Sequence, residues 1–235
     1  MFDAKALRGV VIVAGHYGVG KTNLALNLCR DAARAGAKAT CADLDIVNPY
    51  FRSSDYAKLL LDAGVELIAP LFAGTSLDSP GLSGRLISAV EATRADANRL
   101  LVIDAGGDDA GATALGRFAP AIAAGPYAFI YVVNAYRNLT RTPEEAMALL
   151  PDIEAACHLK ATGIINNSHL KAETDASAVA DAIPFGVEVA RLAGLPLLAQ
   201  TLPNTQGLCP RTRFSAVGDG VDFYPVQVYV TAPWE

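Results

Sequence analysis

The feature that most constrains the fold is a glycine-rich segment at positions 15–22, which matches G-x-x-x-x-G-K-[ST] at every fixed position. Its residues are Gly15, His16, Tyr17, Gly18, Val19, Gly20, Lys21 and Thr22. An apolar run at 9–14 precedes it, and a stretch of helical character that starts at Asn23 follows it. Glycines let successive backbone N–H groups face one concavity, and a helix N-terminus adds positive charge there. The segment, Asn23 included, therefore predicts a phosphate-binding loop, with Lys21 at the β- and γ-phosphates and Thr22 on Mg²⁺.

The rest of the chain alternates short apolar runs with longer stretches of helical period, which is typical of a parallel sheet covered by helices. We expect strands at 9–14, 38–43, 65–69, 99–104, 128–133 and 161–166, with an edge strand in the alternating run 226–230. We expect helices near 21–35, 53–63, 83–95, 142–157 and 174–193, the last interrupted at Pro184. The Gly/Pro-rich segments 74–84 and 204–225 are expected to be loops. The pattern predicts a three-layer α/β P-loop NTPase fold with a mostly parallel central sheet.

Chain length, composition and charge indicate how many domains and which kinds of partner to expect. With 235 residues of even composition, we expect one nucleotide-binding domain over 1–235. The net charge of −5 argues against a nucleic-acid partner, and no apolar run approaches the ~20 residues of a membrane span. We therefore expect a cytoplasmic protein. Four cysteines without C-x-x-C spacing favour reduced structural thiols, and a metal shared between two subunits is the alternative.

Carboxylates follow two of the expected strands. Asp43 and Asp45 lie at the end of the run 38–43, and Asp104 ends the run 99–104 and precedes the glycine-rich stretch 105–111. Parallel strands deliver such residues to one edge of the sheet. Together with a phosphate loop, Asp45 and Asp104 are interpreted as metal- and water-positioning groups, with helix capping as the alternative.

Four segments resemble a known family. They read GHYGVGKT, ADLDIVNP, VIDAGGDDAGA and IINNSHL. They are similar to the P-loop ATPases that include MinD, ParA, the nitrogenase iron protein and the cobyrinic-acid synthase nucleotide-binding domains, and the likeness extends to about residue 170. The resemblance implies that Asp45 positions the attacking water, that Asp104 reaches Mg²⁺ through water, and that the Gly107 backbone senses the γ-phosphate. It also implies that Asn167 or Asn166 binds adenine.

The identity of the base can also be argued from chemistry. Guanine recognition in P-loop proteins generally uses Asn-Lys-x-Asp, whose carboxylate accepts hydrogen bonds from the ring. Here Asn166 is followed three positions on by His169, and Asn167 by Leu170. ATP is therefore preferred over GTP, and simple turn formation is the alternative role for the asparagines.

One loop position departs from the family pattern. In family members that dimerise around ATP, the second loop residue is a lysine that reaches into the partner's site, whereas this chain has His16. His16 either donates a hydrogen bond to phosphate or packs on Tyr17. The segment 46–52, with two aromatic residues and Arg52, is suited to a partner surface or to packing on the next helix.

The leading hypothesis is a Mg²⁺-dependent ATPase that hydrolyses ATP to ADP slowly. It would act as a nucleotide-controlled switch on an unidentified partner protein and form a nucleotide-dependent homodimer. The second hypothesis is a ligase like dethiobiotin synthetase, in which Arg85, Arg211 and Arg213 hold an anionic substrate. A third is an ATP-dependent maturation factor that inserts metal into another enzyme.

Overall fold

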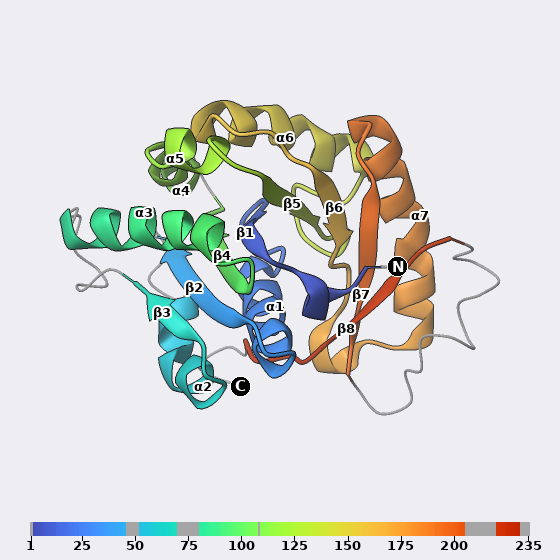
Figure 1. The fold of residues 1–235 in the computed structure, drawn as a ribbon. Helices are drawn as coiled ribbons and strands as arrows, with labels where there is room; N and C mark the ends of the chain where they lie inside the picture. Colours follow the sequence, from blue (N-terminus) through green and yellow to red (C-terminus); the bar gives the residue numbers. More distant parts are fainter. Residues whose placement is uncertain (1, 46–51, 70–79, 108, 205–219, 231–235) are drawn as a thin grey trace.

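The core of the molecule is an eight-stranded sheet in which every paired strand is parallel. The computed structural model describes residues 2–45, 52–69, 80–107, 109–204 and 220–230. The strands are β1 (Gly9–Ala14), β2 (Lys38–Leu44), β3 (Glu66–Ile68), β4 (Arg99–Ala105), β5 (Tyr127–Val133), β6 (Gly163–Asn166), β7 (Leu197–Pro203) and β8 (Phe223–Val226). Their order is β3-β2-β4-β1-β5-β6-β7-β8 (Figure 1).

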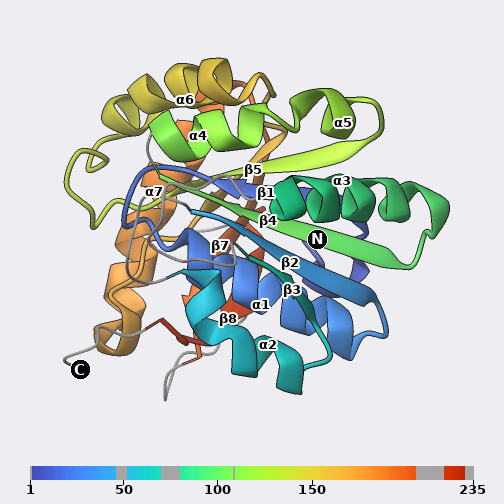
Figure 2. The same cartoon turned by 90° about the vertical axis from the view of Figure 1, so that its left-hand side faces the viewer.

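Helices cover both faces of this sheet. They are α1 (Lys21–Arg34), α2 (Ala57–Asp62), α3 (Pro80–Ala95), α4 (Asp109–Gly116), α5 (Ala119–Ala123), α6 (Pro143–Cys157) and α7 (Ala176–Ala193), with 3₁₀ turns η1 (Ala4–Ala6), η2 (Ser53–Tyr56) and η3 (Lys171–Glu173). Figure 2 shows α3 to α6 on one side of the sheet and α1 and α2 on the other. The three-layer α/β fold with a parallel central sheet is confirmed.

Strand β1 shows why the sheet is buried on both faces. Val10 and Ile12 pack with the helices on one side, whereas Val11 and Val13 pack against α1 on the other. All four are at most 4% exposed. A strand covered on both faces is apolar at every position, which explains the continuous run in the sequence.

Several expected elements differ from the observed ones. Helix α7 runs through Pro184, whose exposed ring faces solvent while its neighbours Ile183 and Phe185 pack inward. The expected edge strand 226–230 is wrong, because strand β8 ends at Val226. Strand β7 and helices α4 and α5 were not expected, and β8 begins inside a segment read as a loop.

Several expectations concern positions outside the described residues. These are residues 46–51, most of 74–84 and of 204–225, Cys209, Arg211 and Arg213. The other cysteines, Cys29, Cys41 and Cys157, are buried thiols outside any disulfide.

The segment 227–230 is bound to one face of α1 through side chains spaced one helical turn apart. The Asn27 amide donates to the Gln227 carbonyl and accepts from its N–H, both at 2.8 Å. Asn23 Oδ1 accepts from Tyr229 N–H at 2.8 Å, and the Arg30 guanidinium lies 4.6 Å from the Tyr229 ring centroid. This segment therefore runs beside the helix that follows the glycine-rich loop.

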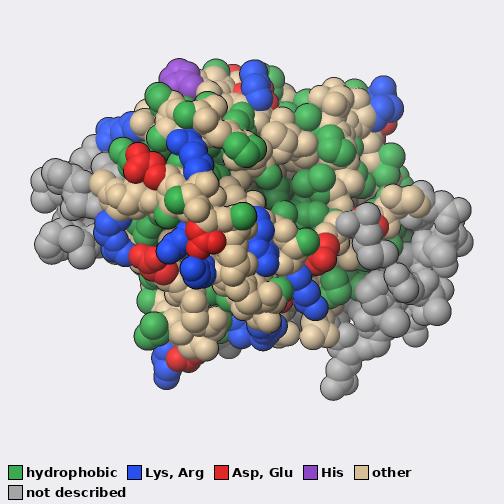
Figure 3. All heavy atoms as spheres, viewed as in Figure 1, with side chains coloured by type: hydrophobic (Ala, Val, Ile, Leu, Met, Phe, Trp, Pro, Cys, Tyr) green, Lys and Arg blue, Asp and Glu red, His purple; other side chains and the backbone are tan. Residues whose placement is uncertain are grey.

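Charged side chains of both signs are mixed on the face of the molecule that Figure 3 shows. On the face seen in Figure 3, Lys and Arg side chains are interspersed with Asp and Glu rather than gathered into one patch. Within the described ranges, no helix is long and apolar enough to cross a bilayer.

We predict that Asn27→Ala lowers the free energy of unfolding by about 1–3 kcal/mol, because it removes the acceptor of the Gln227 N–H and leaves the Gln227 carbonyl with the longer hydrogen bond from Asn23 at 3.1 Å. Urea denaturation measures this. The matched control is Asn98→Ala, whose exposed amide also donates to a carbonyl (Gly36) and accepts from a side chain (Arg8), and which should cost less than about 1 kcal/mol. Equal losses in the two variants would contradict the prediction.

Candidate nucleotide-binding site

The loop between β1 and α1 has the backbone geometry that its glycines permit. Gly18 and Gly20 have φ of 78° and 92°, in the left-handed region that side chains disfavour. A Cβ added at Gly20 would also overlap the side-chain amide of Asn167. Both conformation and space therefore require glycine at this position.

Lys21, the first residue of α1, folds back onto the loop. Its Nζ donates to the His16 carbonyl at 3.1 Å, and the residue is only 7% exposed. Burial and the nearby Lys21 lower the pKa of His16, which favours its neutral form. The loop therefore carries one cationic group, held at its centre by its own backbone.

Gly107 brings the turn after β4 against this loop. An added Cβ would lie 2.6 Å from Lys21 Nζ and 2.7 Å from the Tyr17 backbone nitrogen. No side chain fits in this space without displacing the lysine or the loop. The residue expected to respond to a γ-phosphate is thus in close contact with the residues expected to bind one.

Two buried carboxylates sit side by side at the same edge of the sheet. Asp43 of β2 is the register partner of Asp104 of β4, and the two are 0% and 1% exposed. Asp43 accepts hydrogen bonds from the Asp45 and Ser54 backbone N–H groups at 3.0 and 2.9 Å. Burial raises the pKa of Asp43, and these hydrogen bonds oppose the rise.

The buried carboxylate of Asp104 accepts fewer hydrogen bonds from the described residues than that of Asp43. Its Oδ2 accepts from the Ser53 hydroxyl at 2.5 Å, whereas its Oδ1 is buried with no hydrogen-bond partner in the described structure. Burial, and next the charge of Asp43, raise the pKa of Asp104 to about 7, against the opposing effects of Ser53, Lys21 and Thr22. An unpaired buried carboxylate oxygen of this kind fits a cation or its bound water.

The two candidate asparagines have different surroundings. Asn166 faces α7, where its Nδ2 donates to the Ala182 carbonyl at 2.7 Å, and it does not line the cavity described below. Asn167 Nδ2 donates to the Val19 carbonyl of the loop at 2.7 Å, and its Oδ1 accepts from Thr201 at 2.7 Å. Asn167 thus links β7 to the loop, and of the two candidates it is the one that lines the cavity.

A cavity of about 240 Å³ opens beside the loop. Its lining includes the expected residues Tyr17, Gly18, Gly20, Lys21, Thr22, Asn23, Asp45 and Asn167. It also includes residues that sequence reasoning did not assign to the site, namely Asn134, Arg137, His169, Lys171, Val228 and Val230. Asn134 directly follows β5, a neighbour of β1, so the rule that parallel strands deliver residues to one edge could have found it.

Magnesium is the cofactor that the loop implies, and its ligands in such a site come partly from nucleotide and water. Among the residues that the structure describes, no three His, Cys, Asp or Glu side chains form a metal-binding group. Thr22 and Asp104 are the protein groups suited to the ion, because a hydroxyl and a carboxylate are the oxygen ligands that Mg²⁺ prefers.

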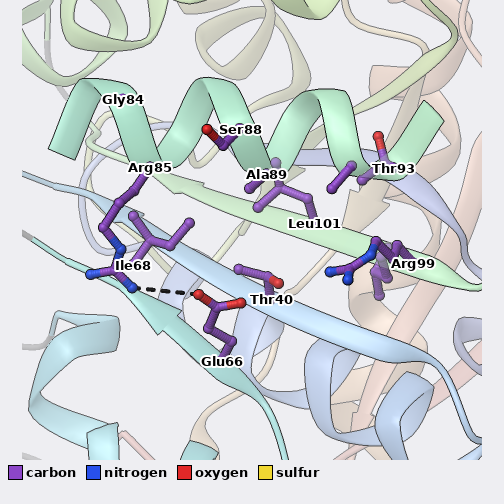
Figure 4. A pocket seen from close by; sticks show the side chains of 12 residues that line it. Thr40, Glu66, Ile68, Gly84, Arg85, Ser88, Ala89, Thr93, Arg99 and Leu101 are labelled. Carbon is purple, nitrogen blue, oxygen red and sulfur yellow. Dashed lines mark hydrogen bonds and ion pairs between the residues drawn. The ribbon is translucent and has the colours of Figure 1, made fainter. Parts of the chain in front are cut away.

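A second cavity, of about 490 Å³, lies between α3 and the strands β3, β2 and β4 (Figure 4). It contains Arg85, which pairs with Glu66 at 3.5 Å and donates to the Leu67 carbonyl. Its lining residues Thr40 and Arg99 lie at the amino ends of β2 and β4, away from the edge that carries the loop. Arg85 contacts β3, which β2 and β4 separate from β1, and it is not among the residues that line the cavity beside the phosphate loop.

Comparisons with known proteins concern the fold. No protein-family model and no curated protein matches the chain. Among solved structures, the signal recognition particle 54 kDa protein from Aeropyrum pernix K1 in complex with GDP gives a TM-score of 0.58 at 14% identity over 88% of this chain. FtsY from Mycoplasma mycoides gives 0.56 at 15% over 83%, and cell division protein FtsY from Thermotoga maritima 0.56 at 16% over 81%.

This chain spans 44% of the first of these proteins, and 61% and 60% of the two FtsY chains. At such identities the likeness concerns the arrangement of strands and helices. The chain thus has the P-loop NTPase fold that its sequence predicts, and the narrower resemblance to MinD and ParA stays an expectation.

We predict that Asp104→Asn stabilises the protein in metal-chelating buffer. In the unfolded chain this carboxyl ionises near pH 4, whereas in the folded protein its pKa is about 7. Wild-type stability should therefore fall as pH rises from about 4 to 7, and the variant, whose amide oxygen can still accept from Ser53, should not share this fall.

Thermal or urea unfolding at pH 5 and pH 8 measures the difference. We expect a gain of about 2–4 kcal/mol at pH 8 and a much smaller one at pH 5. Asp96→Asn is the control, because Lys38 lowers the pKa of that exposed carboxyl and its neutralisation should not stabilise. An Asp104→Asn variant less stable than wild type at pH 8 would refute the assignment.

Proposed function

We propose that this protein is a Mg²⁺-dependent P-loop ATPase of the MinD/ParA-like class, whose slow hydrolysis of ATP acts as a switch on a partner protein. The observation that carries the proposal is the meeting of three elements at one sheet edge. Gly107 after β4 lies so close to Lys21 at the start of α1 and to the loop residue Tyr17 that a Cβ there would overlap both, and Lys21 donates to the loop at the His16 carbonyl. A phosphate bound by the loop would therefore act directly on the turn after β4.

Thr22 and Asp104 would hold Mg²⁺ in this site. The buried Oδ1 of Asp104, which no described residue hydrogen-bonds, and the raised pKa of its carboxyl support this, because a nearby cation relieves both. When bound, the ion would supply positive charge that neutralises the negative charge developing on the nucleotide phosphates.

Asp45 would orient the attacking water, since it lines the cavity beside Lys21 and Thr22. Its backbone N–H donates to Asp43, which fixes the main chain at the end of β2. Catalysis of this kind depends on positioning rather than on a strong base, so we expect slow turnover.

The segment that follows residues 46–51 supports a switch. Ser53 and Ser54 of η2 donate to Asp104 and Asp43, so η2 is tied to both carboxylates of the proposed metal site. A change in the ligands of Asp104 would therefore act on the Ser53 hydrogen bond. In this way a change of the bound nucleotide would alter the surface that a partner protein binds.

The first test is light scattering with nucleotide binding and phosphate release, on wild type and Lys21→Ala, with ADP and with ATP plus Mg²⁺. We expect wild type alone to dimerise with ATP and to release phosphate slowly. Lys21→Ala should lose at least about tenfold in ATP affinity, because a buried charge-assisted contact is removed. The control is Lys58→Ala, an exposed lysine of α2.

Each outcome has a definite meaning. Failure of wild type to bind either ATP or GTP would refute the proposal. Binding and hydrolysis without any change in size would refute the dimer while leaving the ATPase. Preference for GTP would refute the choice of base.

A second prediction concerns Gly107. In Gly107→Ala the new methyl group would crowd Lys21 Nζ and the Tyr17 N–H. The ATP-dependent change in size, measured by light scattering, should therefore be lost, while the affinity for ADP stays within about threefold of wild type. Gly84→Ala is the control, since a Cβ there meets nothing within 4 Å. An unchanged ATP response in Gly107→Ala would show that the turn after β4 does not sense the phosphate.

A further inference from the structure

One polar side chain of the cavity has an unsatisfied group. His169 follows β6 and is 8% exposed, and its Nε2 has no hydrogen-bond partner among the described residues. It lines the cavity beside the loop, together with Asn134, Arg137 and Asn167. Because a buried polar atom without a partner is costly, this nitrogen is suited to a ligand.

The turn around His169 holds the imidazole in one orientation. The Lys171 N–H donates to His169 Nδ1 at 3.1 Å, and Lys171 has the left-handed φ of 55° that brings this N–H around. Thr174 Oγ1 accepts from Leu170 N–H at 2.9 Å and donates to the Lys171 carbonyl at 2.7 Å. Since Nδ1 is an acceptor, the proton of the neutral ring lies on Nε2.

The ring is neutral under ordinary conditions. Burial, and then the positive charges of Arg137 and Lys171, lower the pKa of His169 to about 4. At neutral pH the side chain therefore carries one N–H donor, at Nε2, which has no partner among the described residues.

The other polar groups at this end of the cavity also favour a ligand atom that accepts a hydrogen bond. Asn134 Oδ1 already accepts from Tyr136 N–H, and Asn167 Oδ1 from Thr201. Arg137 and Lys171 carry only donors. The one carboxylate among the described lining residues, Asp45, follows β2, which is separated from β5 and β6 by β4 and β1.

We propose that His169 selects the base of the bound nucleotide by donating its Nε2–H to N1 of adenine. This rests on the proposed function, which places a nucleoside triphosphate in this cavity. Adenine N1 is an unprotonated acceptor, whereas guanine N1 carries a proton and would face the His169 donor. The mismatch leaves two N–H groups opposed and unsatisfied, which is a strong basis for rejection.

The test is competition of unlabelled nucleotides against a fluorescent ATP analogue. The competitors are ATP, GTP, 7-deaza-ATP and 1-deaza-ATP, whose base lacks the N1 acceptor. Wild type should bind ATP at least about tenfold more tightly than GTP and 1-deaza-ATP, and 7-deaza-ATP nearly as well as ATP. His169→Leu should bind ATP about tenfold more weakly and no longer distinguish 1-deaza-ATP from ATP.

The conservative variant separates recognition from structure. His169→Gln places an amide N–H₂ near the position of Nε2 and should restore most of the preference for ATP over 1-deaza-ATP. Inorganic tripolyphosphate, which has no base, should compete equally with wild type and both variants. Melting curves of each variant show that it is folded.

The binding measurements distinguish a failure of this inference from a failure of the proposed function. Wild type that binds no nucleotide would refute the proposed function, and this inference with it. Wild type that binds ATP, with an undiminished 1-deaza-ATP penalty in His169→Leu, would refute only the role of His169. A preference for 1-deaza-ATP or GTP in wild type would likewise overturn it.

Discussion

The site is organised around two carboxylates that the parallel sheet places next to each other in its interior. Asp43 and Asp104 are register partners on adjacent strands, and neither is exposed to solvent. Backbone N–H groups donate to Asp43, whereas Asp104 has one hydroxyl partner and one oxygen without a partner in the described part of the chain. Such burial is expensive unless cations or donors surround it. Ser53 and Ser54 donate to these carboxylates, and the charge of Lys21 lowers the pKa of Asp104, so the pair connects the phosphate loop to the segment before α2.

The sequence predicted the parts of the site that depend on local patterns. The glycine-rich loop is encoded within eight consecutive positions, 15–22, and strand β1 before it is a continuous apolar run because both of its faces are buried. The position of Asp104 followed from the rule that parallel strands end at one edge. Gly107 needed the family resemblance, and the structure adds the close approach to Lys21 that explains its lack of a side chain.

Other parts depend on contacts between distant segments. Strand β7 contains the buried polar residues Gln200 and Thr201, which break the apolar pattern. Gln200 Nε2 donates to the Ser168 carbonyl and Thr201 Oγ1 donates to Asn167 Oδ1, both in the turn after β6. His169 shows no motif, and its role depends on a turn closed by Thr174. The 227–230 segment alternates like a strand but bonds to helix α1 rather than to β7, and only the asparagines of α1 explain this choice.

The attachment of this segment to α1 has a consequence for how the protein is made. Asn27 lies 200 positions before Gln227, its partner, so the ribosome delivers the phosphate loop long before the backbone that packs beside it. Val228 and Val230 form part of the cavity wall, and both are translated after every other residue that lines it. The cavity therefore cannot enclose a ligand until the chain has been made at least as far as residue 230.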